Sequence, residues 1–223
     1  RQDTFSDRVV RGKILSADGQ VLAQTNVAED GTEERYYPFS NMFAHVIGYD
    51  TNGKSGLESE ANFSLLSSHA FFLDQMKNQF LNQKNMGDTV VSTLDSRLQQ
   101  TAYNALGDRR GAVVVLEAST GKILAEVSRP DFDPNTLSQN WDILVNDEND
   151  SSLLNRATNG AYPPGSTFKI VTALDYFRSK GTFEGYSYLC QGSITVGDHT
   201  IQCYHGHVHG QEDFYSAFAN SCN

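Results

Sequence analysis

A serine and a lysine stand three positions apart in the segment AYPPGSTFKI, residues 161–170. Two prolines and a glycine interrupt the chain before Ser166, and the residues after it favour a helix that ends before Gly181. Side chains at positions i and i+3 of a helix share one face, so the Ser166 hydroxyl and the Lys169 amine are expected within hydrogen-bond reach. This spacing suits a nucleophile and its base.

Lys169 can serve as that base only in a particular environment. A serine hydroxyl is a weak nucleophile until a nearby base takes its proton, and a lysine can do so only if burial and positive charge lower its pKa. The apolar neighbours Phe168, Ile170 and Val171 predict a partly buried amine. Backbone N–H groups at the helix N-terminus would favour negative charge developing near Ser166. Taken alone, the four-residue pattern is more typical of a helix cap and a surface lysine.

A second motif, Ser221-Cys222-Asn223, occupies the last three positions. The motifs S-x-x-K, S-x-N and K-T-G, in that order, are the signature of penicillin-binding proteins and serine β-lactamases. The first two are present here in the right order, and the chain ends before a K-T-G would follow. We therefore expect a chain truncated at the S-x-N motif, in which the active site is incomplete.

The wider sequence carries a more specific resemblance. Residues 155–174, NRATNGAYPPGSTFKIVTAL, resemble the active-site segment of a penicillin-binding transpeptidase, and residues 111–135 are similar to the segment that precedes it in those enzymes. Residues 11–25, RGKILSADGQVLAQT, and residues 36–58 resemble the pedestal of the class B, monofunctional group. The resemblance thus runs along nearly the whole chain.

This resemblance implies a role for each motif residue. Ser166 would be the nucleophile that forms an acyl-enzyme, and Lys169 the base that activates it. Ser221 would pass the proton to or from the leaving group, and Asn223 would hold the backbone amide of the donor peptide. The resemblance implies neither a metal nor an organic cofactor.

The resemblance also implies a substrate, partners and a location. The substrate would be a peptidoglycan stem peptide ending in D-Ala-D-Ala, cross-linked to the amine of a second stem, and β-lactam antibiotics would acylate the same serine. The pedestal would meet a membrane glycosyltransferase. An N-terminal anchor outside this chain would hold the protein at the extracytoplasmic face of the bacterial membrane.

The order of predicted elements indicates an α+β protein of two domains. Asp18-Gly19 predicts a hairpin turn, residues 56–66 a helix, and residues 71–81 a second helix. At Gly87 the sequence changes to the pattern of a short strand followed by a helix, which suggests that a small mixed pedestal domain ends near there and covers residues 1–86. Residues 87–223 would form the N-terminal part of a transpeptidase domain that resembles serine β-lactamases, with an antiparallel sheet and a helical cluster.

Within the second predicted domain, three features follow from pattern. Leu94, Leu98 and Ala102 have the spacing of one apolar helix face, and Gly107 would end that helix. The sequence around Ser119-Thr120-Gly121 predicts a hairpin. Residues 128–160 read as a long polar loop leading to Ser166.

Composition excludes some other functions. The 223 residues are 39% hydrophobic, which is compatible with a folded core. Lys and Arg number 17 against 27 Asp and Glu, a formal net charge of −10, and no basic stripe is present, so nucleic acid is not an expected partner. No apolar run approaches the roughly 20 residues that span a bilayer.

The cysteines leave alternatives open. Cys190 and Cys203 could form a disulfide worth ~3 kcal/mol in the chain-entropy model, or remain two buried thiols on a small hairpin. With the nearby histidines they could also be metal ligands, but no C-x-x-C pair is present and alternating histidines on a strand point to one face, so we expect no metal. These histidines are His199, His205, His207 and His209.

Two alternatives to a transpeptidase share some of these features. A β-lactam sensor domain would use the same serine motif for signalling, and a non-catalytic scaffold would keep the pedestal as a docking surface. The pedestal-like residues 11–25 and 36–58 favour a transpeptidase over a sensor, because sensors are not expected to carry them.

Overall fold

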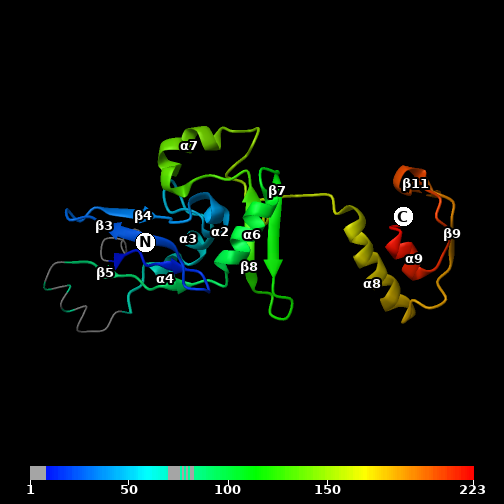
Figure 1. Ribbon diagram of the computed structural model, residues 1–223, viewed down its shortest axis with the longest axis horizontal. Coiled ribbons are helices and arrows are strands. Elements are labelled where there is room, and N and C mark those ends of the chain that lie inside the picture. The colour runs from blue at the N-terminus through cyan, green and yellow to red at the C-terminus, as the bar shows by residue number, and fades with distance from the viewer. Residues whose placement is uncertain (1–8, 70–75, 77, 79, 81–82) are drawn as a thin grey trace. The chain divides into compact units, whose positions relative to one another are not determined.

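The computed structural model describes residues 9–69, 76, 78, 80 and 83–223, so most of the helix predicted over residues 71–81 lies outside the described residues. The chain forms two compact units, Arg1–Ala161 and Tyr162–Asn223 (Figure 1). Within the described ranges, none of the helices has the length and apolar character that a bilayer crossing requires.

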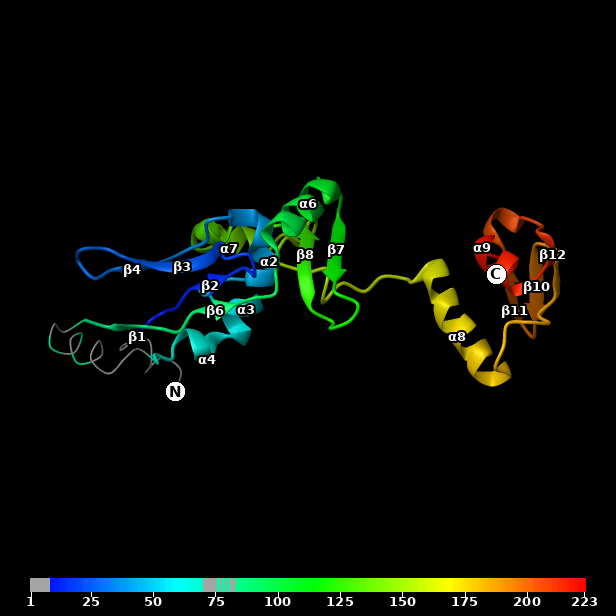
Figure 2. The same ribbon diagram turned by 60° about the horizontal axis from the view of Figure 1, so that its bottom comes forward.

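A four-stranded sheet organises the first unit. Its order is β4 (Glu33–Tyr36), β3 (Val21–Val27), β2 (Ile14–Leu15) and β6 (Val90–Val91) (Figure 2). Strands β2, β3 and β4 pair antiparallel, and β6 joins β2 in parallel. The hairpin predicted at Asp18-Gly19 is confirmed between β2 and β3, where Gly19 has φ of 84°. The preceding strand β1 (Val9–Val10) instead pairs in parallel with β5 (Asn85–Met86).

Short helices pack against this sheet. They are the 3-10 turn η1 (Ser40–Phe43), α2 (Ala44–Ile47), α3 (Gly56–Glu60) and α4 (Asn62–Leu65). The helix predicted over residues 56–66 is therefore confirmed as two short helices that meet at Ala61. The buried core between sheet and helices consists of Ile14, Leu22, Ala23, Tyr37, Met42, Phe43, Ile47, Leu65 and Leu94.

A buried charge cluster ties the first strands to α3. Nε of Arg11 lies 2.6 Å from Oε2 of Glu58, and Nε of Arg35 lies 2.7 Å from Oε1 of the same carboxylate. The three side chains are 7%, 5% and 0% exposed for Arg11, Arg35 and Glu58. We refer to Arg11, Arg35 and Glu58 as the Arg–Glu–Arg cluster.

Helix α6 (Ser96–Leu106) and the hairpin of β7 (Gly111–Leu116) and β8 (Ile123–Arg129) appear as predicted. The carboxylate of Asp95 caps the helix by accepting from the N–H groups of Arg97 and Leu98, and Gly107 ends it with φ of 55°. The buried face differs from the prediction, since Leu98 is 40% exposed while Gln99 is fully buried.

Gln99 is buried because its amide is fully paired. Nε2 donates to the carbonyl oxygens of Met42 and Glu126 at 2.7 Å each, and Oε1 accepts from the N–H of Glu126 at 2.8 Å. A buried polar group with all its partners costs little to desolvate. The amide therefore joins η1, α6 and β8.

The prediction of one long loop over residues 128–160 is wrong for the middle of that range. It contains the 3-10 turn η2 (Pro134–Thr136) and helix α7 (Leu137–Val145). Leu137, Trp141 and Leu144 recur at helical spacing and pack with the residues of a second core. That core also includes Ala44, Tyr49, Phe132 and Leu153.

The second unit begins with the 3-10 turn η3 (Gly165–Phe168) and α8 (Lys169–Lys180), which ends at Gly181 with φ of 74°. Strand β9 (Tyr188–Cys190) pairs antiparallel with β12 (Gly210–Glu212), and β10 (Ser193–Val196) with β11 (His199–Gln202). The turn η4 (Tyr204–Gly206) and helix α9 (Phe214–Ala219) complete this unit.

Helix α9 lies between α8 and the β9–β12 pair (Figure 1). The ring of Phe214 in α9 stacks with that of Phe183 at 4.0 Å and with that of Tyr176 of α8 at 5.8 Å. Tyr186 meets Phe214 edge to face at 5.8 Å. This aromatic packing holds the start of α9 beside the C-terminal half of α8.

The prediction of an α+β fold with mostly antiparallel pairing is confirmed. The compact units divide after Ala161, whereas the sequence pattern suggested a domain boundary near residue 86. The division falls later because α6 packs on η1, and β8 on α2, within the first unit.

Candidate active site

Ser166 and Lys169 are brought together by the turn at the start of the long helix. Gly165 has φ of 55°, and the next residues follow a 3-10 path before the α-helix begins at Lys169. A 3-10 helix has three residues per turn, so side chains at i and i+3 eclipse each other. The change in helix type thus aligns the hydroxyl and the amine more directly than an α-helix would.

Three side chains form a hydrogen-bonded triangle. Nζ of Lys169 lies 3.5 Å from Oγ of Ser166 and donates to Oγ of Ser221 at 2.8 Å. The hydroxyl of Ser221 in turn donates to Oγ of Ser166 at 2.9 Å. The structure therefore brings together all three residues that the sequence predicts to be catalytic.

Ser221 reaches this position because the chain turns sharply after α9. Ser221 has φ of 54°, and its carbonyl oxygen accepts a second hydrogen bond from Lys169 Nζ at 2.5 Å. The N–H of Cys222 bonds to the carbonyl of Ala217 at 2.9 Å, which fixes the turn. At the other end, the side chains of Asp213 and Ser216 form a capping box that starts α9.

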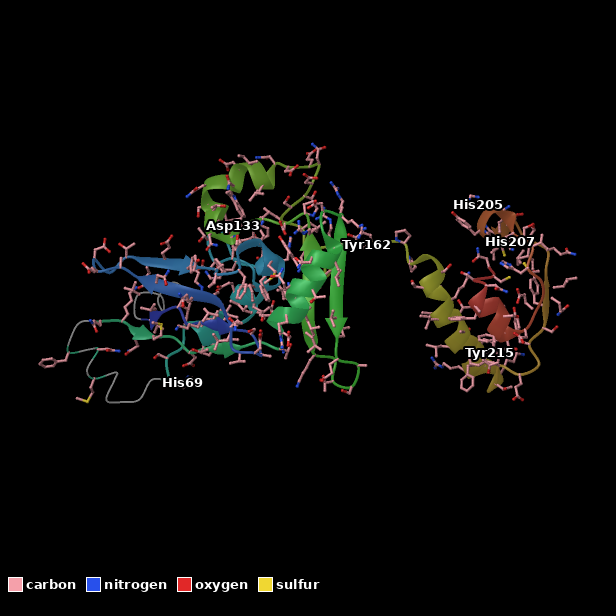
Figure 3. All side chains as sticks on the ribbon, in the orientation of Figure 1. His69, Asp133, Tyr162, His205, His207 and Tyr215 are labelled. Atoms are coloured by element: carbon pink, nitrogen blue, oxygen red, sulfur yellow. The ribbon has the colours of Figure 1, made fainter. Side chains whose placement is uncertain are left out.

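A cavity of about 700 Å³ lies beside the serine pair. Nδ2 of Asn223 donates to the carbonyl of Gln202 at 2.7 Å, which places the side chain at the cavity wall. The lining residues are Ser166, Gln202, Tyr204, His205, His207, His209, Asn220, Ser221 and Asn223. His205 and His207, labelled in Figure 3, were not predicted to border the site. Their only signal in sequence was the unusual density of histidines.

The surroundings of Lys169 differ from the expectation. Its neighbours Phe168, Ile170 and Val171 are 56%, 54% and 53% exposed, so they do not bury the amine. Lys169 is half-buried instead. It lines a small cavity between α8 and α9, together with Tyr176 of α8 and Phe218 of α9.

The contacts of Lys169 in the described structure are with uncharged oxygens. In the part of the chain that the structure describes, Lys169 forms no ion pair, and its hydrogen-bond partners are two hydroxyls and a carbonyl. A carboxylate would stabilise the ammonium form, whereas hydroxyl partners accept either protonation state. The arrangement puts the amine in contact with the hydroxyls of both Ser166 and Ser221.

The three cysteines lie together next to the triangle. Sγ of Cys203 is 3.7 Å from Sγ of Cys190 and 3.8 Å from Sγ of Cys222, and all three thiols are free. Nδ1 of His209 lies 3.4 Å from Sγ of Cys190. Of the two alternatives for Cys190 and Cys203, the structure has the buried thiols.

These thiols differ in acidity. Hydrogen bonds from His209 and Gly192 lower the pKa of Cys190 to about 6. Burial, together with the neighbouring thiols, raises the pKa of Cys222 to about 12. The cluster therefore favours one thiolate and resists further ionisation unless positive charge is added.

The chain matches two family models. The penicillin binding protein transpeptidase domain matches residues 111–223, just over half of the chain. The penicillin binding protein A dimerisation domain matches residues 11–90. The chain therefore belongs to the penicillin-binding protein transpeptidase family, and its relatives place it in the class B group.

Individual relatives agree with this assignment. The chain is 40% identical over 180 residues to the peptidoglycan D,D-transpeptidase PbpA of Mycolicibacterium smegmatis, which covers 73% of the chain and 36% of the relative. It is 36% identical to PbpA of Mycobacterium tuberculosis over 96% of the chain and 47% of the relative. A penicillin G acyl-enzyme complex of penicillin-binding protein A from M. tuberculosis matches with a TM-score of 0.84 and 31% identity, over 96% of the chain and 54% of that structure.

The chain thus spans roughly half the length, or less, of the relatives it matches. The fold and family are established for the part present.

Proposed function

We propose that the protein containing this chain is a peptidoglycan D,D-transpeptidase that cross-links stem peptides through an acyl-enzyme on Ser166. The observation that carries the proposal is the triangle of Ser166, Lys169 and Ser221, with oxygen–oxygen and nitrogen–oxygen distances of 2.9, 2.8 and 3.5 Å. A nucleophile next to a base that a third group orients is the arrangement that acyl transfer requires.

Acylation follows from these contacts. Neutral Lys169 accepts the Ser166 proton as Oγ attacks the carbonyl carbon of the penultimate D-Ala, forming a tetrahedral oxyanion. The peptide bond to the terminal D-Ala breaks, and its nitrogen takes a proton delivered through the Ser221 hydroxyl. D-Ala leaves with that proton, and an ester joins the stem peptide to Ser166.

Transfer reverses these roles. The amine of a second stem peptide attacks the ester carbonyl and gives up a proton through Ser221 and Lys169. The Ser166 oxygen leaves with a proton, so the enzyme is restored and a new peptide bond is formed. We assign Asn223, at the wall of the same cavity, to binding the backbone amide of the donor.

The pedestal, residues 1–86, would bind a partner protein and take no part in catalysis. We place the boundary between pedestal and transpeptidase domain near residue 86, with support from the dimerisation-domain match over residues 11–90. The pedestal would bind a membrane glycosyltransferase. An anchor would hold the protein at the extracytoplasmic membrane face, where its substrate is assembled.

Labelling the whole protein with a fluorescent penicillin tests this function. We expect one covalent adduct on Ser166, located by peptide mass spectrometry, and transfer of a D-Ala-D-Ala donor to an amine acceptor with release of D-Ala. Absence of any adduct on folded protein would reject the proposal. An adduct without transfer to any acceptor would instead support a β-lactam sensor.

A further inference from the structure

A second cavity lies in the first unit and shares no lining residue with the one beside Ser166. Its volume is about 540 Å³, within the range of roughly 300–1,000 Å³ that small-molecule sites occupy. Helices α2 and α3 contribute to its wall, together with β8 and residues 153–159. The wall thus combines residues of both family-model matches, 11–90 and 111–223.

Glu126 of β8 is the buried carboxylate of this cavity. The residue is 5% exposed, and it takes part in none of the ion pairs among the described residues. Its Oε1 accepts a hydrogen bond from Nδ2 of Asn155 at 2.7 Å, whereas Oε2 has no hydrogen-bond partner within the part of the chain that the structure describes. Buried carboxylates are costly unless they are paired. Oε2 is therefore the acceptor that this cavity offers to a ligand.

Glu126 is held in place from two directions. Its N–H donates to the amide oxygen of Gln99 at 2.8 Å, and its carbonyl accepts from the amide nitrogen of Gln99 at 2.7 Å. The amide of Asn155 is oriented in turn, because the N–H of Ala157 donates to its Oδ1 at 3.0 Å. A binding group that is fixed before the ligand arrives loses little entropy on binding.

The other lining residues determine the kind of ligand. Among them, the described structure has neither lysine nor arginine, and the second carboxylate is the exposed Glu60. Apolar side chains make up a large part of the wall. They are Val46, Leu57, Ile123, Phe132, Leu153 and Leu154. This lining suits a molecule with an apolar body and one positive charge.

His45, which also lines the cavity, adds no positive charge near pH 7. Burial lowers the pKa of His45 below its ordinary value of 6.5, so the ring is neutral. Its Nε2 donates to the carbonyl oxygen of Ser152 at 2.9 Å, and the ring meets that of Phe132 edge to face at 5.2 Å. The charge of Glu126 is therefore not compensated from this side.

A metal ion fits this lining less well than an organic cation. Ca²⁺ takes about six to eight oxygen ligands, and Mg²⁺ requires near-octahedral oxygen coordination. The carboxylates among the described lining residues are Glu60 and Glu126, and apolar side chains occupy much of the remaining wall. An ammonium group instead needs few acceptors, and the apolar wall can receive the rest of the molecule.

We propose that this cavity binds a small organic cation, a primary ammonium with an apolar body, whose charge pairs with Glu126. The ammonium would donate a charge-assisted hydrogen bond to Oε2, and such bonds are stronger than those between neutral groups. Because the wall combines several elements, a bound ligand would hold α2 and α3 together with β8 and residues 153–159. The proposal does not depend on acyl transfer at Ser166.

Binding of phenethylamine to the whole protein is the direct test. Isothermal titration calorimetry at pH 7 should detect binding of this cation. Phenethyl alcohol and phenylacetate carry the same ring with a neutral or an anionic group, and they should bind at least about 10-fold more weakly. Glu126→Gln keeps the shape of the side chain and removes its charge, so phenethylamine affinity should fall on the order of 10–100-fold. Glu148→Gln changes an exposed carboxylate of the same unit and should bind as the wild type does.

The position of the bound amine is measured separately. The methyl resonances of Ile123 and Leu153 should shift on addition of phenethylamine, and that of Ile194 in β10 should not. Protein acylated beforehand by penicillin G at Ser166 should bind the amine with unchanged affinity. Loss of binding after acylation would place the amine in the other cavity and overturn the proposal.

Three results would each reject this site: no binding of phenethylamine at millimolar concentration, equal binding of the three compounds, or an unaltered affinity in Glu126→Gln. The comparison of the three compounds uses wild-type protein alone, so it decides the question even if the variant fails to fold. None of these measurements requires Ser166 to react. The cation site and the enzymatic function therefore fail separately.

Discussion

The two units surround their cationic side chains with different partners. In the first, the Arg–Glu–Arg cluster pairs two guanidinium groups with one carboxylate that is fully shielded from solvent. In the second, the partners of Lys169 among the described residues are oxygens of Ser166 and Ser221. The difference separates cations bound to a carboxylate from a cation bound to uncharged oxygens.

The energetics follow from this contrast. Removing one partner of a buried ion pair typically costs 3–5 kcal/mol, because the remaining charge is left uncompensated. Lysine among hydroxyls is not fixed in its charged form in this way, and lysine, unlike arginine, loses its proton at accessible pH. The first cluster therefore contributes to stability, and the second has the contacts that the proposed proton transfer requires.

The largest expected effect is the loss of acylation in Ser166→Ala. Loss of the nucleophile should reduce acylation by on the order of 10⁶-fold, as for other serine acyl-transfer enzymes, while the melting temperature of the whole protein stays unchanged. Labelling with fluorescent penicillin and a thermal melt measure both. Ser179→Ala, near the end of α8, is the matched control, and residual rapid labelling of the Ser166 variant would contradict the assignment.

Lys169→Arg tests the contrast directly. The substitution keeps the positive charge and removes the ability to accept a proton, so labelling should fall on the order of 10²–10⁴-fold. Stopped-flow acylation by a chromogenic β-lactam gives the rate. Lys180→Arg, an exposed lysine at the end of the same helix, should keep the wild-type rate. An active arginine variant would show that charge alone suffices at this position.

Glu58→Gln should damage the other cluster. The change leaves Arg35 buried without its carboxylate and Arg11 with only the more distant Asp50 at 3.9 Å, among the described ion pairs. We expect a loss of about 3–5 kcal/mol in the free energy of unfolding. Denaturant unfolding followed by circular dichroism measures it, and penicillin labelling per folded molecule should not change. Glu60→Gln on the same helix is exposed and should be close to neutral, so equal effects of the two variants would refute the argument.

Gln99→Ala should lower the free energy of unfolding by less than Glu58→Gln does. It leaves two carbonyl oxygens and one N–H without their partners, at a cost of about 1–3 kcal/mol. Its neighbour Gln100 is exposed and bonds only to Asn104, so Gln100→Ala should cost far less. The same denaturant unfolding compares the pair.

The smallest expected effect is on the pH dependence of stability, through the carboxylate of Asp18 in the first unit. Hydrogen bonds from Ser16 and then Ser96 lower the pKa of Asp18 from 3.8 to about 2. A lowered folded-state pKa stabilises the protein above pH 3.8, and that contribution disappears as the pH falls toward 2. Because Asp18 is exposed, the gain is at most about 1 kcal/mol. In Asp18→Asn, the dependence of unfolding on pH over that interval should be shallower, and an unaltered slope would contradict this.

The sequence predicted those features that depend on neighbours along the chain. The i, i+3 spacing of Ser166 and Lys169, the turn at Gly19 and the stop at Gly107 each follow from a few adjacent residues. Helix α7 was not predicted because the many polar residues around it favoured a loop. Its apolar face consists of Leu137, Trp141 and Leu144.

Features that depend on distant partners could not be predicted in this way. Gln99 is buried because carbonyls of η1 and β8 happen to receive its amide. The proximity of Cys222 to Cys190 and Cys203 depends on α9 folding back onto the β9–β12 strands. No local pattern marks Cys222, 19 residues beyond Cys203, for such an encounter.

The hydrogen bond between Ser221 and Ser166 joins residues 55 positions apart, almost the full length of the second unit. Closing a loop of that size must precede the contact, so the triangle assembles only after the intervening strands and α9 have folded. Covalent capture of penicillin would then report on the completed tertiary structure of this unit. A pulse of labelled antibiotic given during refolding would time that last step.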